Sequence, residues 1–261
     1  MKDTELYQTL FGLQAPWRVS EVRVDHGSHT VIVRLDRDDN ATGTCPTCGA
    51  VCSIHDRRVR QWRHLDTMQY KTYLEADVPR VKCPEHGVRN ETLPWAQPNG
   101  RFTQMFECMA ISWLQHASVS SVSKMLDVDW KSLDTMMQRA VKRGLARRRS
   151  APLPVLCVDE TSFQKRHEYV TIVSDGTNGS VLYVGDDRTG DTLRTFYQTL
   201  TPAQRDSIMS VNMDMWRPYI EATCTELVEG DTTICFDRFH ISQATNKAVN
   251  EVRKQEHRQA Q

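Results

Sequence analysis

The sequence predicts a mixed α/β protein in which a helical segment separates two regions rich in β-strands. Residues 20–36 and 71–83 alternate apolar and polar side chains, which is typical of half-buried strands. Residues 102–149 follow a helical pattern instead. After residue 154, three strand-like runs joined by short turns precede an alternation of helix and strand, which favours a mixed sheet.

Bulk composition fits an ordinary globular chain of one large domain or two to three small ones. The chain has 261 residues, of which 39% are hydrophobic and 25% are charged, and its formal net charge is zero. A nucleic-acid-binding protein of this composition must therefore concentrate its positive charge locally. No apolar run reaches 18 residues and the N-terminus lacks a signal peptide, so we expect a cytoplasmic protein with reduced thiols and no membrane partner.

The N-terminal half predicts a short helix, a hairpin and two pairs of metal ligands, followed by helices. We expect the helix in residues 1–16 and the hairpin in 20–36, with a Gly-Ser turn. Pro and Gly residues in PWAQPNGRF interrupt the chain before three helices, and APLP at 151–154 ends them. The helices are expected at about 102–116, 118–126 and 130–146. The domains are expected at 1–96 (zinc-binding), 97–150 (helix-turn-helix) and 151–261 (catalytic).

The C-terminal region predicts five strands and two helices. The strands are expected at VLCVDE, EYVTIVSD, SVLYVGDD, SVNMDMW and TTICFD, with helices near 190–199 and 218–229. The last strand region, ICFDRFHI, is interpreted as a buried strand that ends by presenting Asp237 and His240.

Two knuckles predict a structural zinc site. Cys45-Pro-Thr-Cys48-Gly and Cys83-Pro-Glu-His86-Gly each place two ligands on a tight turn, and the following glycine permits that turn. A closed set of three cysteines and one histidine suits Zn²⁺, and a β-hairpin could fill the gap between the knuckles. His86 is the ligand for which Cys52 or His55 could substitute. The remaining cysteines, which we expect in the core, are Cys108, Cys157, Cys224 and Cys235.

The segment SVSSVSKMLDVDWKSLDTMMQRAVKRGLARRR has the outline of a helix-turn-helix. A short helix capped by Ser118 or Ser120 precedes a longer one opened by Lys131 and Ser132, where a recognition helix would meet bases, as would Asp134. A basic run without acidic residues follows and can neutralise DNA phosphates, although a solvated helix end is the simpler reading. Its members are Arg139, Lys142, Arg143, Arg147, Arg148 and Arg149.

Carboxylates at two strand ends suggest a catalytic metal site. Asp159 ends one apolar run and Asp214 another, so both would emerge at one edge if the strands are parallel neighbours. Oxygen ligands of this kind suit Mg²⁺ or Mn²⁺, which can promote in-line phosphodiester transfer. A lone aspartate at a strand end is more often a cap, and we assign Asp237 and His240 supporting or capping roles. Glu160 is either a neighbouring ligand or solvated.

The order of these motifs resembles the ISL3 family of bacterial insertion-sequence transposases. The resemblance runs from about residue 40 onward and rests on CPxCG, RxWRHLD, VDETSF, NMDMWRPYI and FDRFHI…NKAVNEVRK. It implies an RNase-H-like domain of the DDE type, with Asp159 and Asp214 as the first two catalytic carboxylates, and Asp237 and His240 in the family's DxFH element. It also implies that a zinc finger and a helix-turn-helix bind double-stranded DNA at terminal inverted repeats. His86 stands where a cysteine is common in the family.

Relatives of this kind continue beyond NKAVNEVRK to a helix that carries the catalytic glutamate. We therefore expect a C-terminally truncated, nucleoid-associated transposase with an incomplete sheet, inactive alone and prone to aggregate or to pair with another chain. The alternative is a non-enzymatic zinc and helix-turn-helix protein that represses or competes with an intact transposase. The target sequence, the catalytic metal, the oligomeric state and the transposition pathway do not follow from the sequence.

Overall fold

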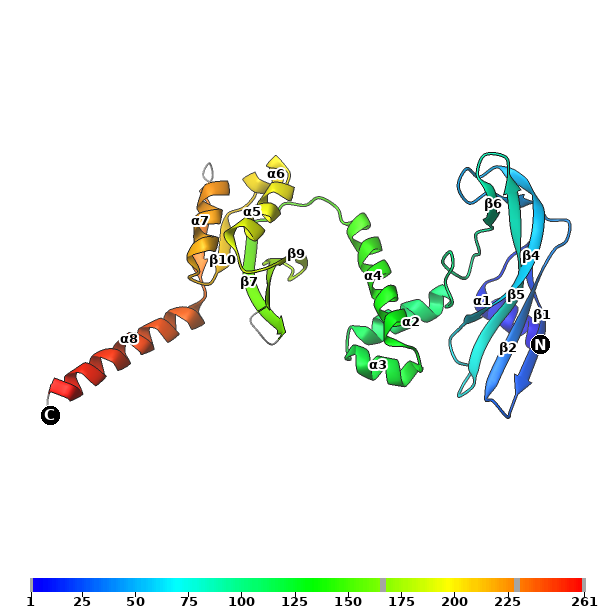
Figure 1. The fold of residues 1–261 in the computed structure, drawn as a ribbon, viewed down its shortest axis with the longest axis horizontal. Helices are drawn as coiled ribbons and strands as arrows, with labels where there is room; N and C mark the ends of the chain where they lie inside the picture. Colours follow the sequence, from blue (N-terminus) through cyan, green and yellow to red (C-terminus); the bar gives the residue numbers. More distant parts are fainter. Residues whose placement is uncertain (1, 165–167, 228–230, 260–261) are drawn as a thin grey trace. The chain divides into compact units, whose positions relative to one another are not determined.

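The computed structural model describes residues 2–164, 168–227 and 231–259, drawn as a ribbon in Figure 1. The chain divides into two compact units, Met1–Arg147 and Arg148–Gln261. No helix in the described part of the chain is both long enough and apolar enough to cross a membrane.

A twisted sheet forms the larger part of the first unit. Its strands lie in the order β1-β2-β5-β4-β3, with β6 paired to β5. Only β2 and β5 are parallel, because β1 and β2 form the predicted hairpin and β4 and β5 form a second, longer one. The elements are α1 (Asp3–Phe11), β1 (Trp17–Asp25), β2 (Thr30–Arg37), β3 (Gly43–Thr44), β4 (Val51–Arg63), β5 (Lys71–Cys83) and β6 (Gly87–Asn90).

The core of this sheet follows from strict alternation along β2 and β5. Every second residue of Thr30–Arg37 is buried, and so is every second residue at the start of β5. Because side chains of a strand point to alternate faces, one face of the sheet becomes apolar. Trp17, Trp62 and Trp95 join that face in edge-to-face ring contacts.

Three helices complete the first unit: α2 (Gln104–Leu114), α3 (Val119–Leu126) and α4 (Trp130–Arg147). Ser118 caps α3 by accepting a hydrogen bond from the Ser121 N–H, as predicted. The cap of α4 differs from the prediction, because Asp129 rather than Lys131 or Ser132 occupies it: the Asp129 carboxylate accepts the Ser132 N–H at 2.9 Å. The helices have their own apolar cluster, separate from that of the sheet, so the predicted boundary at residues 96–97 lies between two cores.

The second unit is a mixed sheet with strand order β11-β10-β7-β8-β9. β7, β8 and β9 form antiparallel pairs, whereas β10 lies parallel to β7 on one side and to β11 on the other. Figure 1 labels most of its elements. They are β7 (Val155–Gln164), β8 (Glu168–Asp175), β9 (Val181–Asp186), α5 (Gly190–Thr199), α6 (Pro202–Asp206), β10 (Ser210–Met213), α7 (Arg217–Glu226), β11 (Thr233–Phe236) and α8 (Arg238–Gln259).

One face of this sheet carries the core of the unit. Leu156, Val158, Val211 and Met213 are buried among side chains of α5 and α7. Tyr219 on α7 extends this packing to β8, where its hydroxyl lies 2.7 Å from the Thr171 hydroxyl. The alternate residues of β7 and β10 therefore point to the opposite face.

Two expectations for the last strand and the cysteines are wrong. The strand at ICFDRFHI is short and largely exposed: β11 ends at Phe236, which is 39% exposed, and α8 begins at Arg238. The chain turns there because the Asp237 carboxylate accepts the Phe239 N–H at 2.8 Å and so caps α8. The cysteines expected in the core are also more accessible than predicted, since Cys157 is half-buried and the other three are exposed, namely Cys108, Cys224 and Cys235.

Candidate functional site

The long β4–β5 hairpin brings the two cysteine knuckles together. One knuckle precedes the start of β4 and the other follows the end of β5, and antiparallel pairing places these ends side by side. Gly49 and Gly87 adopt φ values of +73° and +67°, so each knuckle turns through the left-handed region that favours glycine. The hairpin that was predicted to fill the gap therefore assembles the site.

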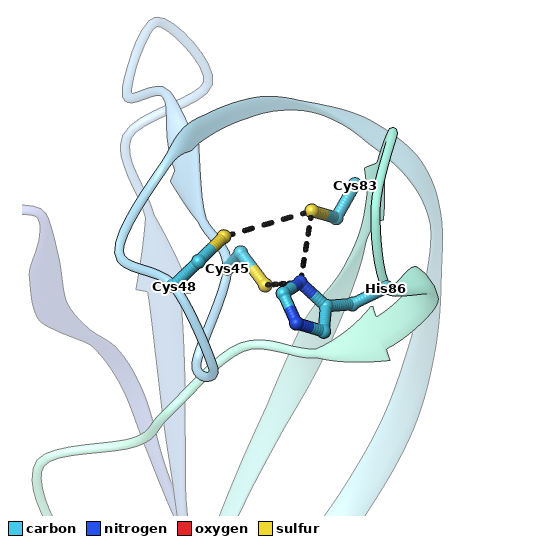
Figure 2. Close-up of side chains that lie close together, drawn as sticks. All are labelled: Cys45, Cys48, Cys83 and His86. Atoms are coloured by element: carbon cyan, nitrogen blue, oxygen red, sulfur yellow. Dashed lines mark hydrogen bonds between the residues drawn. The ribbon is translucent and has the colours of Figure 1, made fainter.

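Four ligand atoms converge at this point (Figure 2). The Sγ atoms of Cys45, Cys48 and Cys83 and a ring nitrogen of His86 all lie within 4.8 Å of one another. Cys48 Sγ is 3.7 Å from Cys83 Sγ, and His86 Nδ1 is 3.5 Å from Cys83 Sγ. A tetrahedral ion with Zn–S bonds of about 2.3 Å separates its sulfur ligands by about 3.8 Å, so the arrangement has the size of a zinc site.

The chemistry of these donors also suits a metal. Hydrogen bonds from the His86 backbone and side chain lower the pKa of Cys83 to about 6, which favours the thiolate that a metal requires. Cys52 lies nearby, but its thiol donates to the Ala50 carbonyl, and neither Cys52 nor His55 belongs to the converging group. The structure thus brings His86, and not its two possible substitutes, to the other ligands.

The candidate DNA-binding residues of α4 fall into two sets. Lys131 and Lys142 are exposed on the helix, as are Arg147 and Arg149 beyond or at its end. By contrast, Ser132 is buried: its hydroxyl donates to Asp129 and accepts from Arg101.

Arg139 is also engaged within the fold. Its guanidinium donates to the Glu107 carboxylate at 2.6 Å, and this carboxylate is 4% exposed. Burial raises the pKa of Glu107, and the positive charges of Arg139 and Arg143 partly oppose that rise. Arg143 is half-buried, and Arg148 donates to the backbone carbonyl of Leu182 in the second unit.

Arg101 is a basic residue of this surface that the sequence did not single out. Its side chain is 74% exposed and lies at the start of α4, where it pairs with Asp129 and contacts Ser132. With Lys131 and Thr135 it lines a small surface pocket of about 190 Å³. Its position in the PWAQPNGRF break gave no helical pattern that could have placed it there.

Asp159 and Asp214 are positioned by the register of two parallel strands. β10 pairs with β7 at a constant offset of 55 residues, from Ser210 with Val155 to Asn212 with Cys157. Continuing this offset by two residues brings Asp214 level with Asp159. Asp159 does not end its strand as predicted, because β7 continues to Gln164 along β8, whereas β10 ends just before Asp214.

The contacts of Asp214 lead to a residue that the sequence did not single out, Arg188. Its Nη2 donates to Asp214 Oδ2 at 3.2 Å, and its Nε lies 3.0 Å from Glu160 Oε1. Asp159, by contrast, is exposed and accepts the N–H of Glu160 at 2.8 Å. Because Arg188 lies in the turn GDDRTG, only its charge distinguished it in the sequence.

The Glu160 carboxyl is an electrostatically unusual member of this cluster. Burial raises its pKa, the negative charges of Asp214 and Asp159 add to the effect, and Arg188 opposes it. Its Oε2 is buried and has no hydrogen-bond partner within the described residues. Oxygen donors of this kind fit a hard divalent cation. Among the described residues, however, only the Cys/His set forms a converging group of three or more such ligands.

A groove of about 900 Å³ opens beside Asp214. Arg188, Asp214 and Trp216 line one side, and His240 and Lys247 of α8 line the other. His240 therefore reaches this site, while Asp237 serves as the cap of α8.

Comparisons with known proteins match this chain in three successive segments. Residues 41–86 match the zinc-finger of transposases IS204, IS1001, IS1096 and IS1165, and residues 91–141 match the helix-turn-helix domain of transposase family ISL3. Residues 156–261 match the transposase domain of the ISL3 DDE type. The chain belongs to transposase family ISL3. The predicted family and the mixed α/β, RNase-H-like fold class are thereby confirmed.

Curated relatives are insertion-sequence transposases. The chain is 27% identical over 263 residues to the transposase for insertion sequence element IS1557 of Mycobacterium tuberculosis, which covers 97% of this chain and 58% of that protein. It is 28% identical over 202 residues to the transposase for IS1001 of Bordetella parapertussis, covering 76% of this chain and 48% of that protein. The chain spans about half the length of the curated relatives it matches.

The family matches cover the geometric features described above. The zinc-finger segment contains all four converging ligands, and the helix-turn-helix segment contains α2, α3 and the first two-thirds of α4. The ISL3 transposase segment contains Asp159, Asp214 and the Arg188 that lies between Asp214 and Glu160.

Proposed function

We propose that this ISL3 family protein is an insertion-sequence transposase that binds terminal-repeat DNA through its first unit and transfers phosphodiester bonds with its second. The observation that carries the proposal is the parallel register of β7 and β10, which brings Asp159 level with Asp214 in the segment that matches the family's transposase domain.

In the first unit, Cys45, Cys48, Cys83 and His86 would hold a structural Zn²⁺. A closed tetrahedral site of this kind stabilises a small fold and leaves no open position for chemistry. It would fix the ends of β4 and β5, and with them the sheet beside the helices. The helices are joined to this sheet by the His64–Thr103 hydrogen bond and the Lys71–Asp127 ion pair.

The exposed cations of α4 would contact the phosphates of a DNA duplex. Lys131, Lys142, Arg147 and Arg149 are the predicted residues that remain exposed, and Arg101 adds a further cation beside Lys131. Phosphate contacts of this type supply affinity and register on the duplex without reading sequence.

In the second unit, Asp159 and Asp214 would be ligands of Mg²⁺ or Mn²⁺. The bound ion would activate the attacking oxygen and stabilise the leaving oxygen of the phosphodiester. Within this chain, Trp216 orients Asp214 by donating its N–H to Oδ1 at 3.1 Å. His240 and Lys247 line the adjoining groove, where a positive charge and an imidazole can bind a DNA phosphate.

The experiment compares wild type, Asp159→Asn and Asp214→Asn on a supercoiled plasmid that carries the terminal repeats of the parent element. We expect nicking at the repeat ends with Mn²⁺ in the wild type, and at least a hundredfold loss in each variant because each removes a charged metal ligand. DNA binding, measured by anisotropy on the repeat duplex, should stay within about twofold, since neither residue lies in the first unit. Nicking that persists in both variants would refute the proposed site.

A second candidate function is DNA binding without catalysis, as a competitor of an intact transposase. The lack of a converging carboxylate group among the described residues favours it. The same assay distinguishes the two functions: repeat-specific binding with no metal-dependent nicking by the wild type would support the competitor.

A further inference from the structure

Arg188 lies between two carboxylates of the second unit. Its Nε is 3.0 Å from Glu160 Oε1 and its Nη2 is 3.2 Å from Asp214 Oδ2. The three side chains are largely withdrawn from water, since Arg188 is 27% exposed and each acid is 15% exposed. These are ion pairs in a partly buried setting, where charges interact more strongly than they do at an open surface.

Aromatic rings hold the guanidinium in this position. Its central carbon lies 4.1 Å from the centroid of the Trp216 ring and 5.7 Å from that of Tyr169. An arginine over the face of a tryptophan is attracted by the ring's electrons, and its planar shape suits stacking. Trp216 also donates its N–H to the other oxygen of Asp214, so one short segment fixes both the acid and its counter-ion.

Both oxygens of Asp214 are thus engaged. Oδ1 accepts the Trp216 N–H, and Oδ2 accepts Arg188. A divalent cation held by Oδ2 would lie within a few ångströms of the guanidinium, and two positive groups that close repel each other strongly. The two cannot share this oxygen at low cost.

We propose that Arg188 is a positioning residue: it is the counter-ion of Asp214 and Glu160 in the metal-free protein and yields Asp214 to the divalent cation. This inference rests on the proposed function. Before metal binds, Arg188 keeps two repelling carboxylates in place. When metal binds, the guanidinium keeps its contact with Trp216 and leaves Oδ2, so the site does not have to form from a disordered cluster.

The test is a titration of the zinc-loaded full chain with Mn²⁺, followed by the loss of the free Mn²⁺ signal in electron paramagnetic resonance, without DNA. Arg188→Gln removes the competing charge, so its Mn²⁺ Kd should be at least tenfold lower than that of the wild type. Its melting temperature without divalent metal should fall, and saturating Mn²⁺ should restore more of it than Mn²⁺ adds to the wild type.

Two matched variants separate this effect from a general loss of charge. Arg188→Lys keeps the positive charge and should bind Mn²⁺ within about threefold of the wild type. Arg194→Gln removes a cation from the Arg194–Asp191 pair on α5 in the same unit, away from the Arg188 ion pairs, and should leave the Kd unchanged. An Arg188→Gln Kd equal to or higher than that of the wild type would overturn the inference.

A measurement on the wild type decides the question even if Arg188→Gln does not fold. In protein with ¹⁵N-labelled arginine, the Nε–H resonance of Arg188, assigned by its loss in Arg188→Lys, should shift on saturation with Mg²⁺. An unchanged resonance would overturn the inference.

Asp214→Asn separates failure of the inference from failure of the proposed function. If this variant loses Mn²⁺ binding while Arg188→Gln binds like the wild type, the metal site stands and only the counter-ion role is wrong. If the wild type binds no Mn²⁺ beyond its zinc site, both fail.

Discussion

At the scale of single residues, the zinc ligands can be separated from their neighbours. Cys52 and Cys83 are both buried thiols near the same knuckle, but only Cys83 belongs to the converging set. This gives a pair of substitutions that differ in one respect only, namely whether a ligand is lost.

We predict that Cys83→Ser lowers the zinc content of the purified protein from about one equivalent to well below half, and lowers its melting temperature. Cys52→Ser should keep about one equivalent, because its thiol donates to the Ala50 carbonyl and holds no ligand position. Zinc is measured by release to a chromogenic chelator. Equal zinc loss in both variants would show that Cys52 is a ligand and that the four-residue set is wrong.

His64 is a second residue with a measurable consequence. It is 6% exposed, its Nδ1 lies 2.8 Å from the Thr103 hydroxyl, and its ring meets Phe11 edge-on. Burial lowers its pKa from 6.5 to about 4, and the positive charge of Arg63 adds to the effect. The unfolded chain therefore takes up a proton near pH 6.5 that the folded chain refuses until about pH 4.

Stability should consequently fall as the pH is lowered from 6.5 to 4, by up to about 3 kcal/mol from this residue. His64→Gln removes the titrating group, so its free energy of unfolding should depend less steeply on pH in this range. The difference between the two proteins, measured by urea unfolding at several pH values, cancels the contribution of zinc loss, which both share. Parallel curves would contradict the assignment of a neutral, buried His64.

At the scale of elements, local signals in the sequence located most helices and strands. Ser118 was recognised as a cap because serine followed by an apolar pattern is a strong start signal for a helix. The start of α4 was misjudged because Asp129 lies in DVDW, which was interpreted wholly as a turn. Likewise, β11 was taken as continuous with RFHI, because the alternation of apolar residues there does not reveal that Asp237 caps a helix.

The pairing between elements was harder to predict. The sequence indicated strands at Asp159 and Asp214, but neighbours in a sheet are decided by packing of the whole unit, so their parallel register remained a conditional statement. Arg188 was missed for the same reason, since its two acidic partners and Trp216 lie 26 to 28 residues away in either direction. A turn residue with distant partners leaves no periodic signal.

For α4, we predict that Lys131→Gln and Lys142→Gln each weaken binding to the repeat duplex. Each should also reduce the slope of log affinity against log salt by about one, as expected when one phosphate contact is lost. Arg139→Gln on the same helix is the control: Arg139 pairs with the buried Glu107, so its loss should lower the melting temperature and leave the salt slope unchanged. A reduced slope in Arg139→Gln alone would mean that a different face of α4 meets DNA.

At the scale of the whole molecule, the two units divide the proposed work. The first combines a zinc site with a basic helix, and the second combines a mixed sheet with acidic side chains beside a groove. A formal net charge of zero is consistent with this division, because cations gather on α4 and carboxylates gather around β7 and β10. Binding and chemistry should therefore be separable by mutation.

The central claim is that Asp159 and Asp214 hold one divalent cation between adjoining parallel strands. Crystals of the protein grown with Mn²⁺ and measured at the manganese absorption edge test it directly. The account predicts an anomalous peak about 2 Å from a carboxylate oxygen of each aspartate, with Arg188 withdrawn from Asp214. A peak that contacts only one of the two aspartates, or no peak there at saturating Mn²⁺, would contradict it.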